Sequence, residues 1–139
     1  TNESIKQKVI QICVQARNQI SSQRKANSEV ICDRVLRLID EEYSDTSLSM
    51  AVVSDKLHVS ASYLSAIIKK NTGETFVSLL TRKRMEKAKE YLLCTSMKVL
   101  EISTQCGYSE QHYFSYCFKR FYGLSPNKMR EEAAKAEKV

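Results

Sequence analysis

One stretch of eleven residues occurs twice in this chain of 139 residues, 50 positions apart. The copies read YLSAIIKKNTG at residues 63–73 and YFSYCFKRFYG at residues 113–123. Tyrosine, serine, lysine and glycine recur at matching positions, with apolar residues between them. Each copy follows a short apolar helical pattern and a serine expected to cap the next helix, Ser60 and Ser109. A helix, a tight turn and a second helix make a helix-turn-helix, and the repeat predicts two of them.

Few residues in this sequence signal turns or strands, since it holds only three glycines and one proline. Apolar residues recur instead at the three- and four-residue spacings of helices. The predicted fold class is therefore all-α, with two helix-turn-helix subdomains joined by a long connecting helix and preceded by a linker helix. The predicted boundaries are residues 1–27 for the linker or signalling helix, 28–75 for the first subdomain, 76–94 for the connecting helix, and 95–139 for the second subdomain and C-terminal tail.

The connecting helix has a length that can be compared with DNA. Its apolar stripe is formed by Phe76, Leu80, Met85, Ala88 and Leu92. About 20 residues rising 1.5 Å each span roughly 30 Å, and successive major grooves on one face of DNA lie roughly 34 Å apart. Such a rod would hold the two repeated helices one turn of DNA apart. Its exposed cations are expected mainly to balance carboxylates: Arg82, Lys83, Lys87 and Lys89.

The N-terminal region carries a short heptad-like stripe. Its members are Ile5, Val9, Ile12, Ala16 and Ile20. Two interpretations stay open, a frayed linker helix and a signalling or dimerising helix that joins an upstream domain to the rest. The stripe is too short to hold a dimer strongly, so we expect a monomer in solution. The polar run SSQRKANS is expected to interrupt the helix, with Ser28 capping a new one. Because the chain begins with Thr1, we expect it to be a fragment of a longer protein.

The second helix of each repeat has one apolar and one small or polar face. Leu64 and Ile68 in the first copy, and Phe114 and Phe118 in the second, face the core at four-residue spacing. Large charged side chains are nearly absent from the opposite face near each N-terminus, and a basic pair follows each helix. A helix that enters the major groove needs short donors and acceptors near the bases, with cations further back for phosphates. The pattern predicts two recognition helices.

Charge is unevenly distributed along the chain, whose formal net charge is +6. Residues 29–45 hold two basic and six acidic residues, whereas residues 56–130 hold thirteen basic and five acidic ones. A basic run alone is often only a solvated face. Combined with two helix-turn-helix units, it favours double-stranded DNA as the partner.

The five cysteines are odd in number and widely spaced, with no CxxC pair, and neither histidine has a partner at metal-ligand spacing. This pattern fits reduced thiols in a cytoplasmic protein, with no metal and no cofactor. The sequence holds no apolar run of membrane-spanning length and no signal peptide, so no membrane association is expected.

Residues 102–130 read ISTQCGYSEQHYFSYCFKRFYGLSPNKMR. This run resembles the signature of the AraC/XylS family of bacterial transcription regulators, and residues from about Val30 onward match the first unit of that family. The resemblance implies a seven-helix domain whose recognition helices, at about 60–71 and 109–122, enter adjacent major grooves. It also implies sequence-specific regulation of transcription without catalysis, and a contact with RNA polymerase.

By position in the motif, the resemblance implies two sets of DNA-binding residues. The expected base readers are Ser62, Ser65 and Ala66 in the first helix, and Gln111, His112, Ser115 and Tyr116 in the second. The expected phosphate ligands are Ser60, Lys69, Ser109 and Lys119. Arg84 and Arg130 lie near helix ends and are as compatible with structural roles as with DNA contacts. His58 occupies a turn position that is Gly107 in the second unit, so the first turn is expected to be less tight.

Two other functions remain as alternatives. The chain could be the DNA-binding part of a repair enzyme, which would need a nucleophilic cysteine in a metal cluster, or a helical protein-interaction module. For the absent upstream domain, a phosphoacceptor receiver domain of a response regulator is the first expectation and a sugar- or small-molecule-binding barrel the second.

Overall fold

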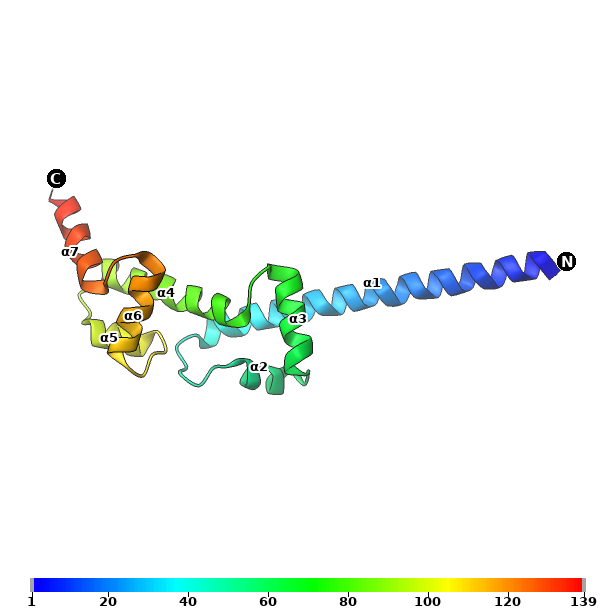
Figure 1. Cartoon of the computed structure of the whole chain (residues 1–139), viewed down its shortest axis with the longest axis horizontal. Helices are drawn as coiled ribbons and strands as arrows, with labels where there is room; N and C mark the ends of the chain where they lie inside the picture. Colours follow the sequence, from blue (N-terminus) through cyan, green and yellow to red (C-terminus); the bar gives the residue numbers. More distant parts are fainter. Residues whose placement is uncertain (1, 139) are drawn as a thin grey trace.

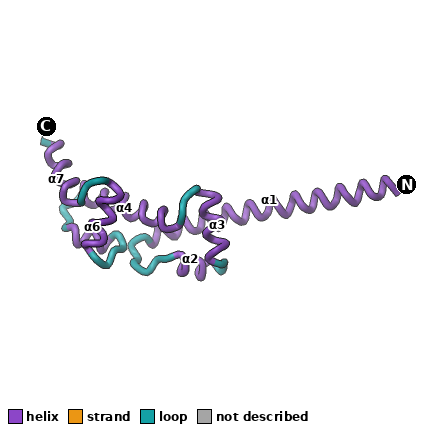
Figure 2. The backbone as a smooth tube through the Cα atoms, viewed as in Figure 1, coloured by secondary structure: helices purple, strands orange, loops and turns teal. Residues whose placement is uncertain are grey.

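Seven helices make up the part of the chain, residues 2–138, that the computed structural model describes, and this part contains no strand. Figures 1 and 2 show an elongated molecule in which a long N-terminal helix projects from two small helical bodies. The helices are α1 (Asn2–Glu42), α2 (Met50–Leu57), α3 (Ala61–Thr72), α4 (Phe76–Cys94), α5 (Val99–Gln105), α6 (Gln111–Tyr122) and α7 (Pro126–Glu137).

Helix α1 is continuous over 41 residues, so the break expected at Ser28 is wrong. Gln, Arg, Lys and Ala in the polar run are good helix formers, and nothing in it forces the helix to end. Ser28 does not cap a helix; it is buried, and its Oγ accepts a hydrogen bond from Asn71 Nδ2 of α3 at 3.0 Å. Residues 2–27 stay exposed, whereas Cys32, Val35 and other residues of the second part are buried.

Capping residues set the ends of the helices in the first body. Ser49 and Ser60 cap α2 and α3, and the backbone N–H of Tyr63 donates to Ser60 Oγ at 3.1 Å. Helix α3 ends at Gly73, where φ is +76°. The core that these helices enclose contains Val35, Ile39, Leu48, Val53, Leu64, Ile68, Phe76 and Leu80.

Each helix-turn-helix turn contains one residue with a left-handed backbone. His58 adopts a left-handed φ of +55°, and Gly107 one of +86°. The backbone N–H of Val59 donates to the Ser54 carbonyl at 3.2 Å, and the equivalent bond from Tyr108 measures 2.9 Å. Histidine therefore accepts the left-handed conformation that glycine adopts more readily, with a slightly longer hydrogen bond.

Helix α6 begins one residue later than expected. Its N-cap is Glu110 rather than Ser109, and the Glu110 side chain makes no capping hydrogen bond. The expectation for Ser109 as the cap is therefore wrong. A shift of 50 residues aligns Ser60 with Glu110 and places Ser109 one position before the helix. The backbone N–H of Phe114 donates to the Glu110 carbonyl at 3.1 Å, as that of Leu64 does to Ser60.

Helix α4 belongs to both bodies. Its first half buries Phe76 and Leu80 in the first core, and its second half buries Met85, Ala88 and Leu92 in the second. The second core also contains Val99, Ile102, Cys106, Tyr108, Phe114 and Phe118. The step of five residues from Leu80 to Met85 turns the buried face by about 140°, so the two bodies pack on different sides of one helix.

Arg84 lies on α4 where the two buried faces meet. Its Nε donates to the Tyr43 carbonyl at 2.8 Å, and its Nη2 donates to the Asp45 carbonyl at 2.8 Å. The same guanidinium lies over the Tyr108 ring of the second body, 5.5 Å from the ring centroid. Gly107 packs so closely that a Cβ there would lie 2.5 Å from the Tyr43 carbonyl oxygen. Arg84 therefore joins the two bodies.

Arg130 has a similar role at the other end of the second body. From α7 it donates to the backbone carbonyls of Leu92, Thr95 and Met97, at 3.0, 3.2 and 2.7 Å. These carbonyls lie at the end of α4 and in the turn to α5, where the helix leaves them without partners. Arg130 is thus a structural residue, one of the two roles that the sequence left open.

Candidate nucleic-acid interface

The candidate base readers lie on one exposed face of each repeated helix. Ser62, Ser65, Ala66 and Lys69 of α3 are spaced at three, four and seven residues, opposite the buried Leu64. In α6, His112, Ser115, Tyr116 and Lys119 have the same spacing, with His112 and Tyr116 exposed and Ser115 half-buried. Gln111 precedes them by one residue, is half-buried and lies toward the side of Phe114 and Phe118. The structure thus brings the predicted residues other than Gln111 together on one face of each helix.

The N-terminus of α3 presents polar groups to solvent. Ser60 is exposed, and its Oγ accepts the backbone N–H of Tyr63, which leaves its hydroxyl proton free to donate. The first N–H groups of a helix and its dipole both favour an anion at this end. Ser109, although it is not a cap, is also exposed, just before the start of α6.

Two of the candidate side chains are held by intramolecular hydrogen bonds. Tyr116 Oη accepts a hydrogen bond from Arg120 Nη1 at 3.2 Å, which orients both side chains on the exposed side of α6. Lys69 Nζ donates to the Gly73 carbonyl at 2.9 Å and so stabilises the C-terminal end of α3. Lys69 therefore lies further from the N-terminal part of the reading face than the serines do.

Two tyrosines were not among the predicted site residues. Tyr63 and Tyr113 occupy equivalent positions on α3 and α6, beside the reading faces, and expose 48% and 58% of their surface. Their exposure at matching positions makes both tyrosines additional candidates for the interface, and the Tyr113 ring also packs on Tyr108, with centroids 6.1 Å apart. The sequence repeat could have identified these two residues, because a tyrosine is the first residue of both copies.

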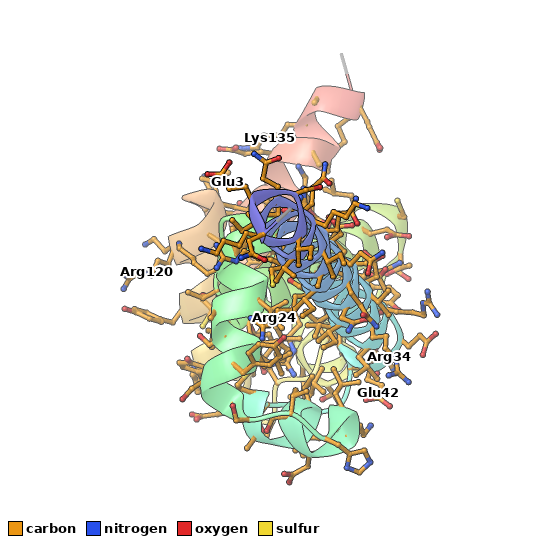
Figure 3. All side chains as sticks on the ribbon, turned by 90° about the vertical axis from the view of Figure 1, so that its right-hand side faces the viewer. Glu3, Arg24, Arg34, Glu42, Arg120 and Lys135 are labelled. Atoms are coloured by element: carbon orange, nitrogen blue, oxygen red, sulfur yellow. The ribbon has the colours of Figure 1, made fainter. Side chains whose placement is uncertain are left out.

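The two reading helices face the same side of the molecule. In Figure 1, α3 and α6 lie near opposite ends of α4 and run in the same direction, and in the perpendicular view of Figure 3 both lie to the left. The 19 residues of α4 span about 28 Å. That length is close to the roughly 34 Å between successive major grooves on one face of DNA.

The cations of α4 are largely engaged within the protein, as expected. Arg82 pairs with Glu74, and Lys83 Nζ lies 3.1 Å from an Asp40 oxygen. Lys87 Nζ lies 3.4 Å from Glu90, and Lys89 Nζ lies over the Tyr122 ring, 5.3 Å from its centroid. These side chains lie outside the reading faces and contribute little to an anion-binding surface.

Cys106 is not suited to be a nucleophile. Burial raises the pKa of the Cys106 thiol to about 12, so it stays protonated at neutral pH and is a poor nucleophile. Among residues 2–138, no three His, Cys, Asp or Glu side chains are grouped as metal ligands would be. In the same part of the chain, none of the helices combines the length and apolar character needed to span a membrane.

Comparison with known proteins agrees with this geometry. Residues 53–132 match the helix-turn-helix domain family. The C-terminal domain of AraT, a response regulator from Geobacillus stearothermophilus, is 43% identical with a TM-score of 0.73, covering 73% of this chain and 84% of that domain. The C-terminal domain of the two-component response regulator yesN from Fusobacterium nucleatum is 41% identical with a TM-score of 0.69, covering 70% and 95%.

The chain spans only part of the length of the curated relatives that it matches. The uncharacterized transcriptional regulatory protein YesN of Bacillus subtilis is 31% identical over 109 residues. The match covers 76% of this chain but only 30% of that relative. The relatives are bacterial regulators, and the matched domains have the same two-unit helical fold. The chain therefore belongs to the AraC/XylS family of helix-turn-helix, DNA-binding transcription regulators.

Proposed function

We propose that this chain is the DNA-reading part of a bacterial regulator and that α3 and α6 enter successive major grooves of one duplex. The observation that carries this proposal is the pair of equivalent helix faces, uncharged near the helix start and basic near its end, on one side of a rod of matching length. Each face offers short hydroxyl, amide and methyl groups near the helix start, where base edges would lie.

The candidate residues divide into two functions within this proposal. Ser62, Ser65, Ala66, Gln111, His112, Ser115 and Tyr116 read base edges. Ser60, Lys69, Ser109 and Lys119 bind phosphates and fix the register on DNA. The hydroxyl groups of Tyr63 and Tyr113 add two phosphate donors at equivalent places, because both side chains flank the reading faces.

The proposed organisation has residues 1–27 as a linker, 28–75 and 95–139 as two reading subdomains, and 76–94 as the connecting helix. In the whole protein, an upstream receiver domain precedes the linker, with a sugar-binding domain as the second candidate. The regulator has no catalytic activity, works in the cytoplasm and contacts RNA polymerase once it is bound. The relatives that are response regulators support the receiver domain.

We expect binding to weaken steeply with salt. Neutralising about five to eight phosphates gives a slope of log affinity against log salt near −5 to −7. The measurement is fluorescence anisotropy on a labelled duplex, chosen by selection from a random pool, at several salt concentrations. A slope shallower than about −2 would contradict phosphate binding, as would a failure of selection to enrich any sequence.

Gln111 and Lys119 are expected to affect binding differently. Gln111→Ala should cost about 1–3 kcal/mol on the selected site and relax preference at one base pair, since its amide can pair with adenine. Lys119→Ala should weaken binding to all sequences about equally. Repeating the selection with each variant gives both affinity and preference. The same uniform loss from both substitutions would rule out base reading by Gln111.

A further inference from the structure

The projecting part of α1 carries an excess of positive charge on one side. Residues 2–27 hold five basic side chains and one acidic one. Lys6, Arg17 and Arg24 lie 11 and 7 residues apart along the helix, and 18 residues make five full turns. These three cations therefore share one face of α1. Arg24 lies one turn before Ser28, the residue that contacts α3.

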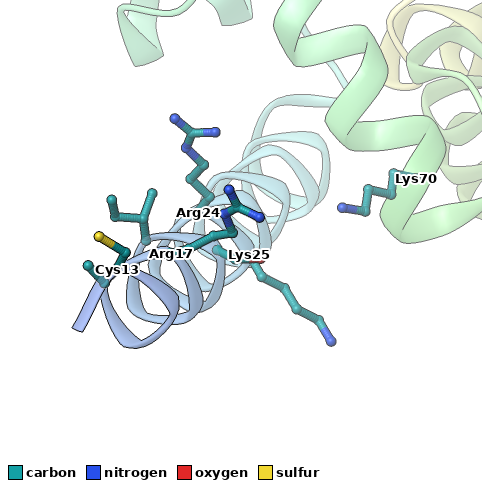
Figure 4. A pocket seen from close by; sticks show the side chains of 8 residues that line it. Cys13, Arg17, Arg24, Lys25 and Lys70 are labelled. Atoms are coloured by element: carbon teal, nitrogen blue, oxygen red, sulfur yellow. The ribbon is translucent and has the colours of Figure 1, made fainter. Parts of the chain in front are cut away.

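This face continues onto α3. A shallow hollow of about 680 Å3 lies between the two helices and is lined by Cys13, Ala16, Arg17, Ile20, Ser21, Arg24, Lys25 and Lys70. Figure 4 shows the Lys70 ammonium directed from α3 toward the arginines and lysine of α1. The four cations come from two helices, and no acidic side chain of the described residues lines the hollow. We call Arg17, Arg24, Lys25 and Lys70 the α1 basic face.

The cations of the α1 basic face differ from Arg82, Lys83 and Lys87 of α4 in forming no ion pair among the described residues. Within residues 2–138, the ion pairs involve Lys56, Arg82, Lys83 and Lys87, and none involves the four residues of the face. Like charges brought together repel one another. A surface that concentrates them without carboxylates is complementary to a row of anionic groups.

The direction of α1 carries the helix along the line in which flanking DNA would run. Figure 1 shows α1 extending roughly along the line from α6 to α3, which is the expected direction of the duplex axis. In Figure 3, α3, α6 and Arg120 lie on the left, whereas Arg34 of α1 points to the right. Arg34 and Arg37 line a different hollow, against α2. The helix thus has a side toward the reading helices and a side away from them.

We propose that the α1 basic face binds the phosphate backbone of DNA that flanks the first major groove, outside the sequence read by α3. Lys6 lies on the same side of α1 as Arg17 and Arg24, and the distance along the helix from Lys6 to Arg24 is about 27 Å, or about eight base pairs at 3.4 Å each. The linker helix then lengthens the footprint on one side only and contributes affinity without base preference. This inference rests on the proposed reading of DNA by α3 and α6.

A second copy of the chain is the competing occupant of α1. Ile5, Val9 and Ile12 of the apolar stripe lie about a quarter-turn or more around the helix, on average, from Lys6, Arg17 and Arg24. Ala16 and Ile20 of the same stripe line the hollow beside Arg17 and Arg24, so a coiled coil along the whole stripe would cover part of the hollow. The hollow next to α3 provides both four cations and an apolar lining of Cys13, Ala16 and Ile20. The two occupants predict different effects of DNA length, which separates them.

The test compares duplexes that contain the selected site with and without flanking DNA. One probe ends at the site, and two others carry about 12 extra base pairs on one end or the other. The proteins are the unaltered chain, Arg17→Gln/Arg24→Gln, and the matched control Arg34→Gln/Arg37→Gln, which removes the same charge from a different side of α1, next to α2. Affinity is measured by anisotropy across several salt concentrations.

We expect the unaltered chain and the control to gain about tenfold in affinity from extension at one end only. The double variant Arg17→Gln/Arg24→Gln should lose this gain and show a slope against log salt that is shallower by about 2, at about 0.9 per phosphate. Its affinity for the short probe should stay within about twofold of that of the unaltered chain. Sedimentation at about 10 μM should give the same oligomeric state for all three proteins.

Three outcomes would overturn the inference. If neither extension improves binding while the short probe is bound, flanking contacts are absent and the proposed reading of the two grooves still stands. If both double variants lose affinity equally, net charge rather than this face is responsible. If no duplex is bound at all, the proposed function fails, and the inference fails with it.

Discussion

Replacing Gly107 with alanine is expected to lower the free energy of unfolding by about 3 kcal/mol or more. A left-handed backbone costs a residue with a side chain about 1–2 kcal/mol, and φ at Gly107 is +86°. The new Cβ would also lie 2.5 Å from the Tyr43 carbonyl oxygen and 2.9 Å from Arg84 Nε. Relieving this overlap needs a backbone shift, which typically costs a further 1–3 kcal/mol, roughly.

The other two glycines provide matched controls for Gly107. Gly73 and Gly123 have φ values of +76° and +81°, and a Cβ at either would meet no atom within 4 Å. Gly73→Ala and Gly123→Ala should therefore cost only the backbone part, about 1–2 kcal/mol. Urea unfolding followed by circular dichroism measures all three. Equal losses at the three positions would show that the close packing against Tyr43 is unimportant.

Arg84→Ala should cost about 3 kcal/mol of stability and weaken the coupling of the two bodies. It removes two charge-assisted hydrogen bonds, to the Tyr43 and Asp45 carbonyls, each of the kind worth about 1.5–3 kcal/mol. It also removes the guanidinium that lies over Tyr108. Because one group makes all three contacts, their contributions do not simply add.

Arg84→Lys and Arg82→Ala are the comparisons for this prediction. A lysine keeps the charge but lacks the planar fork that reaches two carbonyls, so Arg84→Lys should recover less than half of the lost stability. Arg82 forms a partly exposed pair with Glu74, and Arg82→Ala should cost less than about 1 kcal/mol. Unfolding curves rank the three variants. Full recovery by lysine would show that charge alone matters at this position.

DNA binding provides a second measure of how Arg84 couples the two bodies. If this residue fixes the spacing of α3 and α6, Arg84→Ala should weaken binding to the complete two-groove site more than binding to a duplex with only one half. A loss that is equal on the two probes would mean that the bodies keep their spacing without Arg84.

The repeat made the core of this fold predictable, because the same spacing of apolar residues occurs in both units. Leu64, Ile68, Phe114 and Phe118 are fully buried, as their four-residue spacing predicts. The stripe of α4 was equally clear. The sequence could not show that this stripe serves two cores, because the change of face between Leu80 and Met85 has meaning only once the bodies are in place.

The two wrong predictions both concern serines that were expected to cap helices. Ser28 has the chemistry of a cap, yet Asn71 from a distant part of the chain buries it in the middle of a helix. Ser109 has the same chemistry, but the length of the turn starts α6 after Glu110. Capping preference is worth about 1 kcal/mol, so tertiary contacts and turn length override it.

The sequence predicted which positions of each helix share a face, but it could not predict which residues of different helices lie close together. Ser62, Ser65 and Ala66 fall on one face because helical periodicity requires it. The meeting of Arg24 with Lys70 depends on how α1 crosses α3, and no spacing within either helix determines that crossing. The approach of Arg84 to Tyr43 likewise joins residues 41 positions apart.

The unbroken α1 also fixes a rotational phase. Because the helix turns about 100° per residue, inserting one residue before Ser28 would rotate everything on its N-terminal side by about that angle around the axis. Seven inserted residues nearly restore the original rotation about the helix axis and move the N-terminal end of α1 about 10 Å further from Ser28. The number of residues in α1 therefore sets both the distance and the rotation about the helix axis between its two ends. In the same way, the spacing of two operator sites sets which face of DNA each presents.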